Sequence, residues 1–160
     1  EECDEPEALG LRLKTRSEHE LLEDFWEGAK NYDVFVTYNG WPFVWAFLYH
    51  RSAMLGLQPT VEIAKQRFVT RQAPPYQVDL LHELSFAGAI KKVSLPTWCE
   101  AYQIEHQTDM SGGDVAEFFR QEKFLDIVTH NAADIVALTE LYALWLKYHA
   151  PRAFLNSLEW

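Results

Sequence analysis

Asp33-Val-Phe-Val-Thr-Tyr38 is the stretch of this 160-residue chain that decides its fold. Its nearly continuous apolar character is typical of a parallel strand that is covered on both faces. Asn39-Gly40 follows at once and predicts a turn that ends the strand. Open α/β sheets place their ligand sites at the carboxyl ends of their strands, so the residues after Tyr38 are the first candidates for a functional site.

Helix signals flank this strand. Ser17 and Glu20 have the spacing of a capping box, which predicts a helix from there to about residue 29. A second helix is expected over about 42–55, because Pro42 suits a first helical turn and Gly56 an end. Short strands are predicted over 8–13 and 61–63. The apolar residues that the first helix should direct inward are Leu21, Leu22, Phe25 and Trp26.

Helices dominate the second half of the chain. Residues 76–80 lead into a helix that runs through Phe86, and Ser94 and Asp114 begin two more, which run through residues 102 and 120. The longest helix is expected over about 125–149, before Pro151. Strands interleaved with helices predict the α/β class. At this length, with 48% hydrophobic residues, a single domain over 1–160 is expected.

The cysteines, the N-terminal residues and the length of the apolar runs indicate the cellular compartment of the protein. Cys3 and Cys99 are too far apart for a metal-binding spacing, and Cys99 beside Trp98 is expected in the core. The acidic first seven residues lack the basic start and apolar stretch of a signal peptide. No apolar run reaches the ~18 to 20 residues of a membrane span. We therefore expect a cytoplasmic protein without a membrane partner.

The net charge of −10 argues against a protein that grips nucleic acid by bulk attraction. The charge is uneven, however, because residues 51–92 carry six basic and three acidic side chains. A polyanion would be steered to this middle third, and a solvated loop is the alternative reason for its charge. The basic residues there are Arg51, Lys65, Arg67, Arg71, Lys91 and Lys92.

Two side-chain patterns are candidates for chemistry. His130 and Asp134 stand four residues apart on the long helix and so project from one face. Such a pair can hold a divalent ion and position a water, whereas on an outer face it is simply solvated. Phe43 and Phe47 offer stacking faces for bases, whereas their helical spacing also fits a core. The residues alone leave both alternatives open.

These segments together resemble a known family. Tyr38-Asn39-Gly40, followed by an aromatic residue, a Phe-Leu pair and Arg51, is similar to the second motif of the DEDD 3′–5′ exonucleases. The similarity is to the group related to the proofreading domain of B-family DNA polymerases. Residues 130–142 resemble the third motif, and the connecting helices are matched in order between the two. The resemblance covers about residues 17–148.

The resemblance implies a ribonuclease H-like fold, a mixed sheet flanked by helices, and a site that uses Mg²⁺ or Mn²⁺. Its substrate would be the 3′ end of single-stranded DNA or RNA. Carried onto this chain, the third motif assigns Asp134 as metal ligand and catalytic residue, with His130 where the family has a tyrosine. The residues that the second motif places against nucleic acid are Tyr38, Asn39, Phe43, Phe47 and Arg51.

The departures from the family pattern concern the metal site. The first motif, an Asp-x-Glu, has no counterpart before Ser17, and Val44 stands where the second motif has an aspartate. Of four metal-binding carboxylates only Asp134 is present. Two-metal cleavage needs carboxylates that hold both ions about 3.5 to 4 Å apart, and Mg²⁺ binds one carboxylate weakly. The pattern therefore predicts an inactive or weakened site.

Three functions remain open at this point. The leading hypothesis is a degenerate exonuclease domain that binds or scaffolds single-stranded nucleic acid. The first alternative is an active exonuclease, completed by a segment outside this chain or by a carboxylate such as Asp79 or Glu62 in place of Val44. The second is a protein-interaction module in a larger complex. Its acidic surface and its aromatic-rich C-terminus, with Phe154, Leu158 and Trp160, would bind a protein partner.

Overall fold

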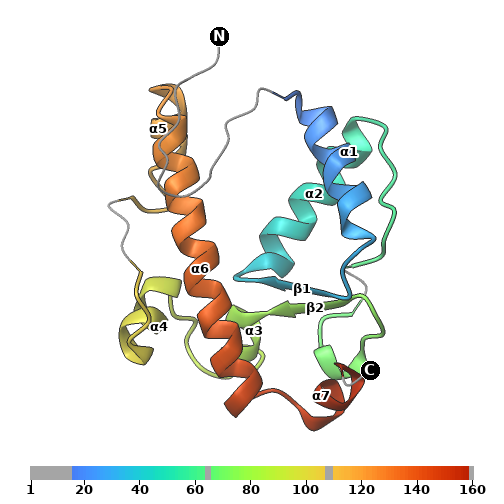
Figure 1. The fold of residues 1–160 in the computed structure, drawn as a ribbon, viewed down its shortest axis with the longest axis vertical. Helices are drawn as coiled ribbons and strands as arrows, with labels where there is room; N and C mark the ends of the chain where they lie inside the picture. Colours follow the sequence, from blue (N-terminus) through green and yellow to red (C-terminus); the bar gives the residue numbers. More distant parts are fainter. Residues whose placement is uncertain (1–15, 64–65, 107–109, 159–160) are drawn as a thin grey trace.

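A two-stranded parallel sheet stands at the centre of the molecule (Figure 1). This computed structural model describes residues 16–63, 66–106 and 110–158, so Cys3 and the strand predicted over 8–13 lie outside the described residues. Strand β1 (Val34–Thr37) pairs with β2 (Tyr76–Asp79). Val34 lies opposite Tyr76 and Thr37 opposite Asp79, so both strands end at the same edge.

Helix α1 (Glu18–Ala29) begins with the predicted capping box. The Ser17 N–H donates to the Glu20 carboxylate at 2.8 Å, and the Glu20 N–H donates to the Ser17 hydroxyl at 3.3 Å. Leu22 and Trp26 are buried. The prediction that Leu21 faces inward is wrong, since its side chain is 55% exposed. The buried stripe follows residues 22, 26 and 29, and Leu21 lies beside it on the helix.

Strand β1 is parallel as predicted, but it is less buried than its sequence indicates. All four of its residues are half-buried, whereas all four residues of β2 are buried. Phe35 packs on one face of the sheet, and Val34 and Val36 pack on the other. Each strand has one strand partner within the described ranges, so packing makes the difference: Val78 of β2 is a core member of its cluster, whereas Val34 and Val36 pack against the margin of that cluster.

The helix predicted over 42–55 forms, but its first part is π-helical and not α-helical. A π-helical segment, η1 (Gly40–Trp45), continues directly into α2 (Ala46–Met54). The strand predicted over 61–63 is wrong: the described residues contain no strand there. Instead, the Ile63 N–H donates to the Tyr49 hydroxyl at 3.2 Å, and the Ile63 side chain packs beside Trp26. A side-chain partner thus replaces a strand ladder.

The second half is helical as predicted, with two differences. Residues 76–79 form β2 before the short helix begins, because they pair with β1. A final helix after Pro151 was not predicted, and it buries Phe154, so Phe154 is not available to a protein partner. The elements are η2 (Val69–Arg71), α3 (Leu80–Leu84), α4 (Leu95–Tyr102), α5 (Val115–Arg120), α6 (Phe124–Tyr148) and α7 (Arg152–Leu158).

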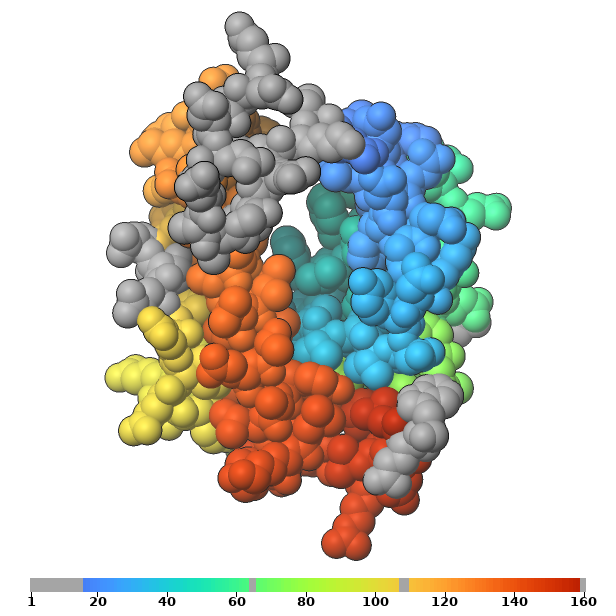
Figure 2. All heavy atoms as spheres, in the orientation of Figure 1, coloured from blue at the N-terminus to red at the C-terminus, as the bar shows by residue number. Residues whose placement is uncertain are grey.

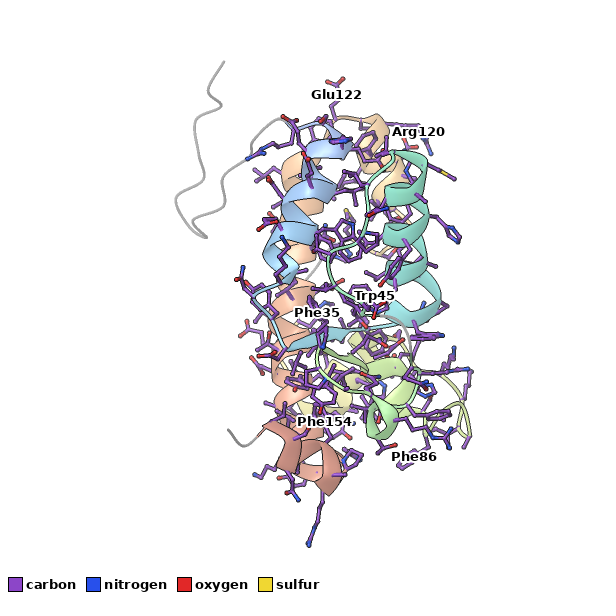
Figure 3. All side chains as sticks on the ribbon, turned by 90° about the vertical axis from the view of Figure 1, so that its right-hand side faces the viewer. Phe35, Trp45, Phe86, Arg120, Glu122 and Phe154 are labelled. Carbon is purple, nitrogen blue, oxygen red and sulfur yellow. The ribbon has the colours of Figure 1, made fainter. Side chains whose placement is uncertain are left out.

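Two hydrophobic clusters lie on the two faces of the sheet. Figure 3 shows Phe35 and Trp45 on the side of α1 and α2, and Phe154 on the other side. The first cluster joins Trp26, Ala29, Trp45 and Ile63. The second surrounds Val78 with residues of α4, α6 and α7, and it contains Cys99, as predicted.

The expected α/β class is confirmed as a mixed architecture of mostly helices with a small sheet. Among the described residues this sheet is purely parallel rather than mixed. None of the helices in the described ranges is long and apolar enough to cross a membrane.

Candidate functional site

One carboxylate ties the carboxyl ends of the two strands together. Asp79 Oδ1 accepts the N–H of Asn39 at 2.9 Å and that of Leu81 at 3.1 Å, and Oδ2 accepts the Trp41 N–H at 2.9 Å. The Asp79 side chain thereby caps α3 and fixes the turn after β1. Because backbone donors occupy both oxygens, Asp79 has the surroundings of a structural cap rather than of a metal ligand.

Tyr38 and Asn39 occupy the turn that follows β1. The Tyr38 hydroxyl donates to the Val93 carbonyl. Burial raises the pKa of Tyr38, and the nearby Asp79 carboxylate raises it further, so the hydroxyl keeps its proton. Asn39 is exposed and has left-handed backbone angles, with φ 59°, a conformation that asparagine tolerates well.

Phe43 and Phe47 lie on the surface, not in the core. Their side chains are 67% and 54% exposed, and their rings stack with centroids 6.5 Å apart. Between them in sequence, Trp45 is the residue that enters the core. Of the two alternatives that the sequence leaves open, the structure excludes the core position and shows a stacked pair of exposed aromatic rings.

Arg51 is held by a carboxylate of the neighbouring helix. Its Nε donates to Glu18 Oε1 at 2.6 Å and its Nη2 donates to Glu18 Oε2, so the pair is bidentate. The guanidinium holds the pKa of Glu18 below its usual value. A phosphate that binds Arg51 would therefore have to displace Glu18.

Asp134 lies between two imidazoles. Its Oδ1 is 2.7 Å from His106 Nε2, and its Oδ2 is 3.7 Å from His130 Nε2. Both rings are almost buried, whereas the Asp134 side chain is 39% exposed. The helical spacing places His130 and Asp134 together as predicted. His106 could not be found from the sequence, since 28 residues separate it from Asp134 and no local pattern marks it.

The described residues do not fit a pair of Mg²⁺ ions. The ion prefers oxygen ligands, and the two neighbours of the Asp134 carboxylate are nitrogen ligands. Across the described ranges no three His, Cys, Asp or Glu side chains meet in an arrangement that could hold a metal ion. Val44 is half-buried and packs against the cluster around Trp26. No cleavage step through a bound metal follows from these residues.

The two motif segments lie on opposite sides of an opening in the molecule. Figure 2 shows the surface hollowed between α6 and α1, with α2 visible deeper inside. The third motif is on α6, and the second motif runs from β1 through η1 into α2 (Figure 1).

One protein family matches nearly the whole chain. Its model covers residues 7–160, and its description is a predicted 3′–5′ exonuclease related to the exonuclease domain of PolB. Among curated proteins and among solved structures, none matches this chain. The match includes both segments described above, those that carry Asn39 and Asp134.

Proposed function

The chain belongs to this family of predicted 3′–5′ exonucleases related to the exonuclease domain of PolB, and on that basis we propose that it binds single-stranded nucleic acid ends with little or no cleavage. The fold that we propose for the complete domain is ribonuclease H-like. The exposed, stacked pair Phe43–Phe47 is the observation that carries the proposal. These two residues follow Asn39 by four and eight positions, in the segment that is expected to contact nucleic acid by its resemblance to the second motif.

Stacking of nucleic-acid bases would explain why two large apolar rings are exposed to water. A base stacked on an aromatic side chain contributes about 1–3 kcal/mol, and every base has a suitable face. The binding is therefore expected to tolerate any sequence. Asn39 of the same segment is also exposed.

Fluorescence anisotropy with a labelled single strand tests the binding. Phe43→Ala and Phe47→Ala are each expected to weaken binding by about tenfold, the loss of one stacked base. Phe119→Ala is the matched control, because Phe119 is 63% exposed on α5, outside both motifs. Equal losses in all three variants, or a wild-type protein that does not bind, would contradict the proposal.

A nuclease assay with Mg²⁺ or Mn²⁺ separates the proposal from the active alternative. We expect the wild-type chain to leave a labelled single strand intact, since Asp134 is the one carboxylate that matches the DEDD pattern. Shortening of the strand that Asp134→Asn abolishes would establish the active enzyme instead. Val44→Asp supplies the carboxylate of the second motif and is expected to tighten Mn²⁺ binding in calorimetry, with or without cleavage.

A further inference from the structure

A small cavity lies at the carboxyl ends of the strands, beside the turn that follows β1. Its volume is about 170 Å³, and its walls include Asn39, Trp41, Asp79 and His82. Arg67 and Lys92 complete the lining from two other segments of the chain. Ligand pockets that enclose drug-sized molecules are larger, about 300–1,000 Å³, so this cavity suits a small ion or one group of a larger ligand.

The two cations of this cavity differ from most others in the chain. Across the described ranges, neither Arg67 nor Lys92 has a carboxylate or an aromatic ring as partner. The basic side chains that do have such partners are Arg16, Lys30, Arg51, Arg71, Arg120, Lys123 and Lys147. In a protein with net charge −10, two unpaired cations on one small cavity mark a place for an anion.

His82 adds a polar group without a partner. It is 7% exposed, and its Nε2 atom is covered and makes no hydrogen bond in the described structure. Burial lowers the pKa of His82. The positive charges of Arg67 and Lys92 lower this pKa further, whereas the negative charge of Asp79 raises it. A neutral imidazole keeps one N–H to donate. Buried polar groups are normally hydrogen-bonded, so the unpartnered Nε2 atom is a second feature of this wall, besides its charge, that favours a polar ligand.

The Asp79 carboxylate in the wall does not cancel this attraction. Its two oxygens accept backbone N–H groups of Asn39, Trp41 and Leu81, which compensate its charge. Two cations against one carboxylate leave the lining positive.

We propose that this cavity binds a phosphate group, held between Arg67 and Lys92 against the His82 wall. Arginine and lysine form charge-assisted hydrogen bonds with phosphate oxygens, and both side chains are exposed and free to close over it. The phosphate belongs either to a nucleic-acid chain or to a free anion. The proposal stands apart from the proposed function, because inorganic phosphate alone tests it.

Nuclear magnetic resonance of the full chain provides the test. Inorganic phosphate is added at constant ionic strength, with chloride as the balancing ion, so that non-specific screening stays fixed. The wild-type protein is expected to show saturable shifts at His82, Asn39 and Trp41. Arg67→Ala and Lys92→Ala are each expected to weaken binding by about tenfold, the effect of losing a hydrogen bond to a charged group.

Lys91→Ala is the matched control, because Lys91 neighbours Lys92 in sequence but does not line the cavity. Its affinity for phosphate is expected to equal that of the wild type. Equal losses in Lys91→Ala and Lys92→Ala, or shifts that do not saturate, would overturn the proposal. Both changes are at exposed positions, so the fold is expected to persist in the variants.

A second titration identifies the source of the phosphate. A thymidine dinucleotide with a 5′-phosphate is compared with the same dinucleotide without it. If the phosphorylated form competes with inorganic phosphate, the cavity holds a phosphate of nucleic acid; if neither form competes, it holds the free anion. Strand binding that depends on Phe43 and Phe47 but not on Lys92 would leave the proposed function intact while refuting this cavity as its phosphate site.

Discussion

At the scale of single residues, a buried hydrogen bond between two side chains contributes to the stability of the fold. The Trp26 indole N–H donates to the Ser52 hydroxyl at 2.8 Å, between α1 and α2, and Ser52 is fully buried. This bond places a polar contact among apolar side chains of the first cluster. A buried donor that loses its partner costs about 1–3 kcal/mol.

Ser52→Ala is therefore expected to lower the free energy of unfolding by about 1–3 kcal/mol, measured by urea denaturation. In a Trp26→Phe background the indole donor is already absent. The same serine change is then expected to cost clearly less. An equal cost in both backgrounds would show that the hydrogen bond is not the cause.

Glu83 makes stability depend on pH. Burial raises its pKa to about 7, and the Asp79 charge adds to the effect. The folded state therefore holds this proton where the unfolded chain, with an ordinary pKa near 4.5, has lost it. The sign follows directly: stability falls as pH rises from about 4.5 to 7 and then stays level.

Glu83→Gln, which copies the protonated form, is expected to remove this fall. Relative to the wild type, the variant should gain about 1–3 kcal/mol between pH 5 and pH 8, which denaturant midpoints can measure. Glu100→Gln, at an exposed position on α4, should leave the wild-type pH dependence unchanged. A wild-type stability that does not change between the two pH values would contradict the assignment to Glu83.

At the scale of elements, the tight passage from β1 into η1 depends on a glycine. A Cβ atom on Gly40 would lie 2.1 Å from Thr37 Oγ1 and 2.4 Å from Thr37 Cβ, closer than any side chains approach. The backbone of the second motif therefore folds back directly onto the end of its own strand.

Gly40→Ala is expected to lower the free energy of unfolding by about 1–3 kcal/mol, the usual cost of forcing atoms into a packed site. Gly28→Ala is the control, since nothing lies within 4 Å of its Cβ and alanine favours a helix. Thermal denaturation compares the two. A Gly40→Ala protein as stable as Gly28→Ala would mean that the turn can open without cost.

Local sequence signals predict most of the helices and strands, but they do not predict contacts between residues far apart in the sequence. The helices begun by Ser17 and Ser94 are where their caps predict them, because a side-chain cap acts within one turn. The helix after Asp114 is also in its predicted place, but the Asp114 carboxylate accepts hydrogen bonds from Ser111 and does not cap it. The pairing of β2 with β1 depends on residues about forty positions apart, so residues 76–79 were assigned to the approach of a helix. His106 beside Asp134 was missed for the same reason. Phe43 and Phe47 show that helical spacing alone does not separate core from surface.

At the scale of the whole molecule, the negative net charge limits how many phosphate groups of a polyanion the protein can contact. The chain carries −10, and the described basic residues of the middle third are Arg51, Arg67, Arg71, Lys91 and Lys92. Arg51 is already paired with Glu18. Binding of a single strand should therefore involve few phosphates and weaken with salt.

The salt dependence of binding tests this limit. Each phosphate contact on a single strand contributes about −0.7 to the slope of log K against log salt. With Lys65, the middle third has six cations at most, which give a slope no steeper than about −4.2. Anisotropy titrations at several salt concentrations measure it. A steeper slope would require additional basic residues, and a slope of zero would exclude phosphate contacts altogether.

In the described part of the chain β1 pairs with one strand alone, and this has a consequence for hydrogen exchange. The Tyr76 N–H donates to the Asp33 carbonyl, so by the parallel pattern the amides of Phe35 and Thr37 point toward β2, and those of Val34 and Val36 point toward the other edge. In deuterated water, Val34 and Val36 should exchange quickly while Phe35 and Thr37 stay protected. The four amides thus form a built-in reporter: any segment that joins the free edge would slow Val34 and Val36 and leave their neighbours unchanged.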